Sequence, residues 1–236
     1  MQKEFKLSRG LLTAIVMLIL IPVTLLLAWN YFDRSYYVTS LLVILYCMLP
    51  FFVMFEKRAP QARELVTIAV MCALVVASRA AFIWLDHFKP MAGLIIITGI
   101  ALGAEAGFLI GALSMLVSNM IFGQGPWTPW QMFAFGLVGF LAGLFYRLRI
   151  IDKSRKKLCI FGGLTVFCIV GPLLDTSTFF MGVGAMNLES AIATYMTGLP
   201  VNAVHALATV LTLYFCSRPL FEKLDRIKSK YGMMEG

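Results

Sequence analysis

Long apolar segments, separated by short breaks that carry charge or proline, dominate the hydrophobic pattern of the chain. A membrane-spanning helix needs about 20 apolar residues, within a range of about 17 to 25. On that basis the pattern predicts an all-α, polytopic transmembrane bundle of eight helices. Their predicted ranges are 11–31, 37–55, 65–84, 91–102, 108–121, 132–146, 158–181 and 200–216.

The apolar run from Met91 to Phe122 is too long for one span. It contains Glu105, and a carboxylate is costly in the middle of a bilayer. We therefore predict a short helix over 91–102, a turn at Glu105 and a returning helix over 108–121. The first of these needs tilting or local thinning of the bilayer in order to cross.

A charged segment closed by proline, 56–60, is the clearest internal boundary. It separates two additional N-terminal helices, within 1–60, from a six-helix membrane domain over 61–218 and a basic tail over 219–236. Lys3, Lys6 and Arg9 precede the first apolar run as in a signal peptide, but that run is too long and lacks a cleavage site, so we expect a retained helix. Pro200 suits the first turn of the last helix, which predicts a loop over 182–198.

The composition supports a membrane protein. Hydrophobic residues make up 60% of the chain, the mean hydropathy is +0.86 and only 14% of residues are charged, whereas soluble domains have about 45–50% apolar and about 25% charged residues. No two of the five cysteines have C-x-x-C spacing, so the sequence predicts buried thiols, with no metal site, disulfide framework or cofactor.

The distribution of Lys and Arg predicts the orientation, since these residues favour the cytoplasmic side. With both termini in the cytoplasm, only Arg34, Arg79 and Lys89 of the 20 Lys and Arg fall outside the inner segments. The net charge of +8 therefore needs no nucleic-acid partner. The loops near 86, 124 and 190 would then face the exterior.

Residues 122–131, here called the Trp loop, join two apolar runs. Gly123, Gly125 and two prolines make the segment a poor helix and a poor strand. Trp127 and Trp130 have two interpretations: both belong to the aromatic belt of the interface, or a rigid loop presents them for stacking on a flat solute. We favour the second, because the belt does not account for the surrounding glycines and prolines.

Small residues recur every fourth position in the predicted helix over 65–84. Such a row allows close approach between helices in lipid, either within this protein or with a partner. Chance is the other explanation, because alanine is common in membrane helices. The row consists of Ala69, Ala73, Ala77 and Ala81.

Polar residues gather in the predicted outer half of the bundle. A carboxylate inside a span should pair with a cation or face a polar cavity, and Arg79 is the obvious partner for Asp175. This pair either binds a solute or only locks two helices together. The candidate substrate-binding residues are Arg79, Lys89, Asn119, Gln124, Trp127, Trp130, Gln131, Asp175, Asn202 and His205.

Several activities find no support in the sequence. There is no G-x-x-x-x-G-K-[ST] loop for ATP and no H-E-x-x-H metal motif. Ser114 and His205 would be the catalytic pair of an intramembrane hydrolase, but Ser114 lacks a nucleophile elbow. We therefore expect a binding subunit without catalytic residues. A self-contained secondary transporter or channel is the alternative, although no convincing inverted repeat is visible.

From about Glu64 to Cys216 the chain resembles the membrane-embedded S component of energy-coupling-factor (ECF) transporters. The Trp loop is the most specific part of this resemblance. The matching residues are Ala69, Ala73 and Ala77; Phe88-Lys89-Pro90 before Gly99-Ile100-Ala101-Leu102-Gly103; Ala106-Gly107-Phe108 with Gly111-Ala112-Leu113; Val117-Ser118-Asn119; and Gly123-Gln124-Gly125-Pro126-Trp127-Thr128-Pro129-Trp130-Gln131-Met132.

The resemblance implies a subunit of a bacterial plasma-membrane importer that captures a vitamin outside the cell and delivers it by toppling. Its partners would be a transmembrane T component, which the alanine row would contact, and two cytoplasmic ATPases. The outer loops would cover the substrate, and the Trp loop is most similar to that of the cobalamin branch. The two extra N-terminal helices depart from the family's six-helix core.

Overall fold

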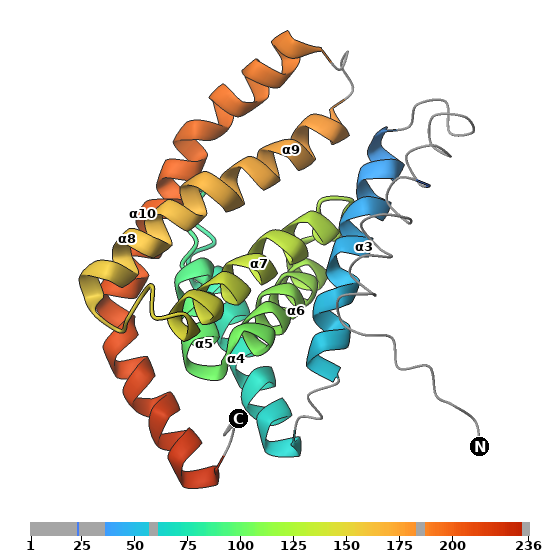
Figure 1. Ribbon diagram of the computed structural model, residues 1–236. Coiled ribbons are helices and arrows are strands. Elements are labelled where there is room, and N and C mark those ends of the chain that lie inside the picture. Colours follow the sequence, from blue (N-terminus) through green and yellow to red (C-terminus); the bar gives the residue numbers. More distant parts are fainter. Residues whose placement is uncertain (1–22, 24–35, 57–60, 183–186, 233–236) are drawn as a thin grey trace, which may run out of the picture.

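An all-α bundle is found in the computed structural model, which describes residues 23, 36–56, 61–182 and 187–232 (Figure 1). Seven helices cover these ranges, if the continuous stretch from α8 to α9 counts as one. Apart from Val23, the predicted helix over 11–31 lies outside the described residues, so a bundle of eight is not confirmed. The elements are α3 (Tyr36–Glu56), α4 (Ala62–Ala81), α5 (Met91–Leu102), α6 (Ala104–Phe122), α7 (Thr128–Arg147), α8 (Arg155–Thr165), the π-helical η2 (Val166–Val170), α9 (Gly171–Met181) and α10 (Leu188–Tyr231).

The short helix α5 is enclosed by the rest of the bundle. All 12 of its residues are buried, and it packs against α4, α6, α7, α8 and α10. A helix that is apolar on every side belongs in such a position, because it has no polar face to turn toward water. The predicted range 91–102 is confirmed.

Glycines bring α5, α6 and α7 together without intervening side chains. A methyl group added at Gly99 would overlap the backbone of Gly139, and one added at Gly139 would overlap Gly107. Close backbone approach is a main source of helix association in lipid. These three glycines therefore set the spacing of the central helices.

Two other glycines end helices in backbone conformations that other residues rarely adopt. Gly103, with φ of 98°, separates α5 from α6, and Gly123, with φ of 114°, ends α6. The break in the long apolar run is thus confirmed, although it consists of Gly103 alone and Glu105 already lies in the first turn of α6.

Helix α3 packs on the outer face of α6 and α7 through aromatic side chains. The rings of Phe51 and Phe108 are stacked, with centres 4.1 Å apart and planes at 7°. Phe51 also meets Phe140 edge-on at 5.0 Å. This part of the predicted N-terminal region therefore contributes to the same hydrophobic core as the later helices.

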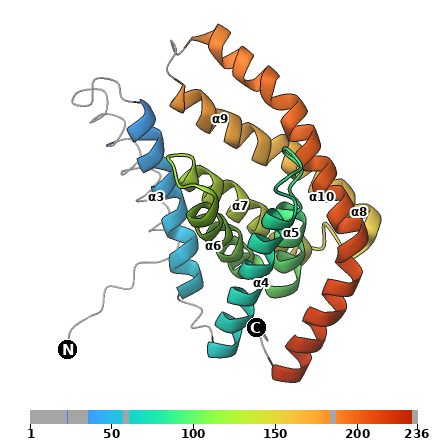
Figure 2. The ribbon, with the colours of Figure 1, turned by 180° about the vertical axis from the view of Figure 1, so that it is seen from behind.

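The last helix is much longer than predicted. It begins at Leu188 rather than 200, where Asn187 and Ser190 form a reciprocal capping box. Pro200 and Pro219 lie inside the helix, and the ribbon bends along its length (Figures 1 and 2). Proline removes a backbone hydrogen bond and bends a helix. The predicted loop over 182–198 is therefore largely helical.

The helix also continues through the predicted basic tail to Tyr231. Phe221 and Leu224 are buried in the main core, and Lys228 donates to the backbone carbonyl of Ala101 at 2.9 Å. These contacts hold the last turns of α10 against the end of α5, so they are part of the bundle.

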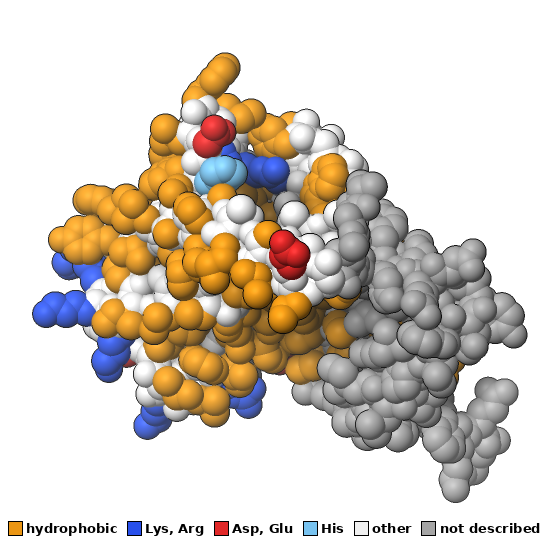
Figure 3. Space-filling view, turned by 90° about the horizontal axis from the view of Figure 1, so that it is seen from above, with side chains coloured by type: hydrophobic (Ala, Val, Ile, Leu, Met, Phe, Trp, Pro, Cys, Tyr) orange, Lys and Arg blue, Asp and Glu red, His pale blue; other side chains and the backbone are white. Residues whose placement is uncertain are grey.

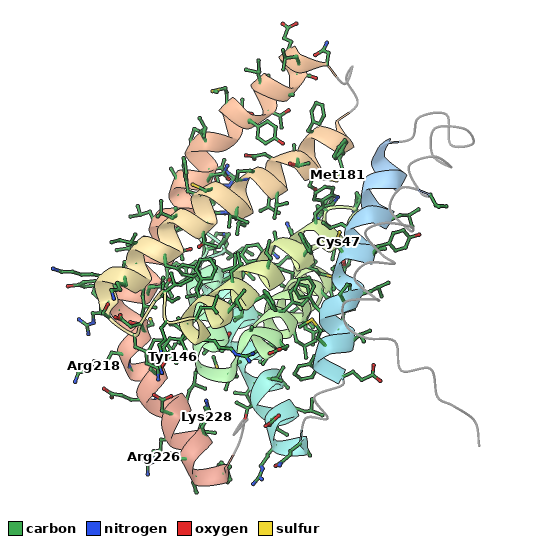
Figure 4. All side chains as sticks on the ribbon, viewed as in Figure 1. Cys47, Tyr146, Met181, Arg218, Arg226 and Lys228 are labelled. Carbon is green, nitrogen blue, oxygen red and sulfur yellow. The ribbon has the colours of Figure 1, made fainter. Side chains whose placement is uncertain are left out.

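The two ends of the bundle differ in charge. Arg218, Arg226 and Lys228 lie toward the lower end in Figure 4, while Met181 lies near the upper end. Five helices are long and apolar enough to cross a membrane, namely α4, α6, α7, the stretch from α8 to α9, and α10, and two shorter apolar helices accompany them. The loops after α4 and α6 lie toward the upper end, as does the end of α9 (Figure 1).

Candidate substrate-binding site

Asn119 on α6 is the centre of a polar network at the upper end of the bundle. Its side chain is fully buried, and its amide donates to the hydroxyl of Thr128 at 3.0 Å and to the side-chain carbonyl of Gln131 at 2.8 Å. Its own carbonyl accepts a 2.8 Å hydrogen bond from Arg79. One amide thus links α4, α6 and the start of α7, and a network with its partners supplied fixes how the three helices meet.

Arg79, in the last turn of α4, donates to neutral acceptors. Besides Asn119, its guanidinium donates to the hydroxyl of Ser118 at 2.9 Å and lies 5.1 Å from the centre of the Phe122 ring. The predicted pairing of Arg79 with Asp175 is wrong, since no ion pair joins these two residues among the contacts of the described residues. The reason is that α4 packs against α6, whereas α9 packs against α7, α10 and η2.

The irregular part of the Trp loop is shorter than predicted, because α7 begins at Thr128 rather than near Met132. Pro129 lies in its first turn, where a missing N–H leaves no hydrogen bond unmade. Trp130 and Gln131 are consequently helical residues, and the loop proper is 123–127.

Side chains fix this loop on both flanking helices. The hydroxyl of Thr128 donates to the side-chain carbonyl of Gln124 at 2.8 Å. The amide of Gln124 donates to the backbone carbonyl of Leu116 on α6 at 3.2 Å. The loop is therefore joined to the same network as Asn119.

The two tryptophans have different surroundings. Trp127 is 39% exposed, and its ring lies so close to Gly125 that a methyl group there would overlap it. Trp130 is only 8% exposed, and its ring centre is 6.1 Å from that of Phe180 on α9. Trp127 is thus accessible to a solute, while Trp130 packs α7 against α9.

Asp175 on α9 and Asn202 on α10 form a second polar region. The amide of Asn202 donates to the carboxylate of Asp175 at 2.8 Å. A cavity of about 260 Å³ opens beside this pair, and Thr178, Thr194 and His205 also line it. Its wall combines carboxylate, amide, hydroxyl and imidazole groups, which is the mixture that positions a polar solute.

Basic groups lie next to this cavity. The ring centre of His205 is 6.3 Å from that of His87, which belongs to the loop between α4 and α5. Lys89, two residues after His87, donates to the backbone carbonyls of Phe82 and Leu85. Figure 3, a view from above, shows a histidine beside Lys or Arg side chains on this face of the molecule.

The predicted site residues therefore fall into two groups at one end of the bundle. Arg79, Asn119, Gln124 and Gln131 share one network, and Asp175, Asn202 and His205 line one cavity. Sequence reasoning missed three residues: Ser118, Thr128 and His87. The last had a signal, because the chain contains only two histidines.

The alanine row lies on an outward face of α4. Ala69, Ala73, Ala77 and Ala81 are all exposed, so the row does not pack against the described helices. A nearly apolar groove of about 580 Å³ runs beside it between α4 and α10, with Leu74, Phe215 and Lys223 among its lining residues. This face is separate from the polar residues of the cavity.

The arrangement offers no constellation for metal binding or hydrolysis. Among the described residues no group of three or more His, Cys, Asp or Glu could hold a metal ion. Ser114 is fully buried on α6, and no hydrogen bond among the described residues joins it to His205. The site is built for binding through hydrogen bonds, charge and aromatic contact.

Comparison with known families identifies the chain. The model of the family described as "ECF-type riboflavin transporter, S component" matches residues 60–218, whereas no curated protein and no solved structure is similar enough to match. The cobalamin branch was inferred from the Trp loop alone. The match does not support it, because the matching family is described as a riboflavin transporter. Since the matched range is well over half of the chain, the protein belongs to the family of ECF-type riboflavin transporter S components, and is a substrate-binding membrane subunit of a transporter rather than an enzyme.

Proposed function

We propose that this S component captures riboflavin at the outer face of a bacterial plasma membrane and delivers it for ATP-driven uptake by partner subunits. The observation that carries the proposal is the polar cavity of Asp175, Asn202 and His205, which opens at the upper end of an otherwise apolar bundle. The printed name of the matching family supports riboflavin as the solute.

The chemistry of riboflavin fits the residues at this end. Its flat ring system has a polar edge, and its side chain carries several hydroxyl groups. Trp127 offers an accessible aromatic face, while Asp175, Asn202 and the threonines offer hydrogen-bond partners for hydroxyl groups. The cavity is slightly smaller than the roughly 300–1,000 Å³ of drug-sized sites, so the ring would extend from it toward the Trp loop.

The partner subunits would bind an apolar surface of the chain, unlike the polar cavity that would bind the solute. Exposed small residues on α4, beside an apolar groove, are suited to close contact with another membrane helix. We assign this face to the T component, which two cytoplasmic ATPases would drive. Both termini would lie in the cytoplasm, because Arg218, Arg226 and Lys228 lie toward the end opposite the cavity (Figure 4) and positive segments favour the cytoplasmic side.

Binding of riboflavin to the chain alone tests the proposal. The detergent-purified protein, stripped of bound solute, is titrated into riboflavin while the fluorescence of the flavin is followed. We expect saturable quenching that an excess of cyanocobalamin does not reverse. A flat titration, together with no flavin in the mass spectrum of the freshly purified protein, would rule the proposal out.

A further inference from the structure

The apolar groove between α4 and α10 is the larger of the two hollows described for the molecule, and it lies on the side that Figure 2 shows. Both helices pack against α5, which contributes Leu94 to the groove, but in the described part of the chain they barely pack against each other. The groove volume of about 580 Å³ is within the roughly 300–1,000 Å³ of small-molecule sites. There is therefore room for a ligand between the two helices.

The hydroxyl groups that line the groove already have partners in their own helices. Ser78 donates to the backbone carbonyl of Val75 at 2.6 Å, and Thr212 donates to that of Ala208 at 2.7 Å. The other lining residues are almost all apolar. Because a polar ligand would lose its hydrogen bonds to water without replacing them here, the groove is suited to an apolar occupant.

The groove extends lengthwise along α10. Phe82 and Phe88, in and around the loop after α4, line one part of it, and Lys223 lines it near the opposite end of the bundle. From Leu211 to Lys223, α10 rises about 18 Å at about 1.5 Å per residue. One leaflet of the hydrocarbon core is about 15 Å deep, half of the core's total of about 30 Å. The groove thus has about the length of one lipid acyl chain.

Lys223 gives the groove a charged end. Its side chain is exposed, and no described residue forms an ion pair with it, whereas Lys153 and Lys157 pair with Asp225 and Asp152. Basic pockets between membrane helices on the cytoplasmic side bind the headgroups of anionic lipids. An unpaired ammonium at the end of an apolar groove is complementary to a lipid of this kind, which has a negative phosphate joined to an apolar chain.

We propose that the groove holds one acyl chain of an anionic phospholipid, whose phosphate pairs with Lys223. In the orientation proposed above, this lipid belongs to the cytoplasmic leaflet. The groove lies beside the alanine row, so the bound lipid borders the face assigned to the T component. The proposal goes beyond solute capture and does not depend on it, because the groove and the polar cavity have no lining residue in common.

Native mass spectrometry of the detergent-purified full chain tests the site. Protein stripped of lipid is titrated with phosphatidylglycerol and, separately, with phosphatidylcholine that carries the same acyl chains. We expect phosphatidylglycerol to saturate at one molecule per chain and to bind more tightly than phosphatidylcholine, because only the first has a net negative headgroup for Lys223 to attract.

A substitution within the groove tests where the acyl chain lies. Leu74→Trp should weaken phosphatidylglycerol binding at least about fivefold, because the larger ring occupies space that the chain needs. Leu65→Trp is the matched control, since it makes the same change at another exposed position of α4 that does not line the groove. It should bind the lipid as the wild type does.

The headgroup contact has its own pair of variants. Lys223→Gln should lower the preference for phosphatidylglycerol over phosphatidylcholine about fivefold, the change expected for one lysine at an anionic lipid surface. Lys156→Gln removes the charge of an exposed lysine on α8 outside the groove and should leave the preference unchanged. Since Lys223 is exposed, its replacement decides the question even if Leu74→Trp does not fold.

Three results would refute the lipid site. They are equal binding of the two lipids by the wild type, an unchanged preference in Lys223→Gln, and full phosphatidylglycerol binding by folded Leu74→Trp. A dimer that Leu74→Trp dissociates would also refute it, because the groove would then be an interface between two copies of the chain. Riboflavin titrations of the same samples report on the proposed function separately.

Discussion

Single side chains at the upper end determine how the site is assembled. Asn119 has partners on two other helices, so its one amide sets the relative position of α4, α6 and α7. Because buried polar groups are costly when they lose their partners, the Trp loop and Arg79 are held in one arrangement before any solute arrives. A preorganised site of this kind loses less entropy on binding.

Trp127 is the aromatic residue that a flat solute can reach. We expect Trp127→Ala to weaken riboflavin binding by about 1–3 kcal/mol, on the scale known for base–aromatic stacking. The measurement is a fluorescence titration of the purified variant. Trp84→Ala is the matched control, because Trp84 is 92% exposed and should have no effect. Equal riboflavin affinities for wild type and Trp127→Ala would contradict stacking on the solute and leave only the aromatic-belt interpretation of Trp127.

At this scale the sequence identified residue types better than pairings. Asn119 was chosen as a polar residue in the outer half of the bundle, and Gln124 and Gln131 as residues of the Trp loop. The three do share one network. The partner of Arg79 was wrong, since hydropathy does not reveal how a helix is rotated or which helix lies beside it. The acceptors of Arg79 are Asn119, which was already among the chosen residues, and Ser118 beside it.

Among the elements, α4 is notable for the face that it leaves uncovered. We predict that Ala73→Leu weakens assembly with the T component and ATPases, because a larger side chain prevents close helix approach. Co-purification of tagged ATPase subunits measures assembly, and a riboflavin titration of the isolated chain should be unaffected. Ala203→Leu on α10 is the control, since it makes the same change at another exposed position. Normal assembly of the Ala73 variant would show that the row is not a docking face.

Helix boundaries were predicted well where a glycine or a charge ends an apolar run and poorly where proline was the guide. The break at Gly103 follows from the backbone freedom of glycine. Pro200 was taken as a helix start, yet the capping pair Asn187 and Ser190 begins the helix earlier. The pair has the spacing of a capping box, with Ser190 in place of the usual Glu or Gln. Pro219 is likewise inside α10, so proline alone did not mark an end in this chain.

At the scale of the whole molecule, the polar cavity lies toward one end of the bundle and basic side chains lie toward the other. We predict that Gln124→Cys, in a background whose own five cysteines are replaced, reacts with a membrane-impermeant maleimide in intact cells. Lys156→Cys should react only after the cells are opened, because positive segments stay in the cytoplasm. Labelling of Gln124→Cys only from the interior would contradict external capture.

Helix α3, which precedes the matched range, is also part of the bundle. The family match begins at residue 60, but Phe51 of α3 stacks on Phe108 of α6 inside the matched range. The sequence predicted a helix here from its apolar length. It did not predict where the helix packs, because an apolar helix in lipid has no polar face to indicate its neighbours.

The backbone contacts of Gly99, Gly107 and Gly139 leave no room for α5, α6 and α7 to slide past one another. We therefore expect any movement that admits a solute to occur outside these three helices. In Figures 1 and 2, α9 and the first part of α10 run side by side and reach beyond the central helices as a two-helix arm. The π-helical segment η2 lies at the base of α9, and Pro200 lies in the first half of α10. Both features are typical positions at which a helix bends, so each helix of the arm has a possible hinge. If the chain admits a vitamin as proposed, we expect this arm to swing against the block formed by α5, α6 and α7.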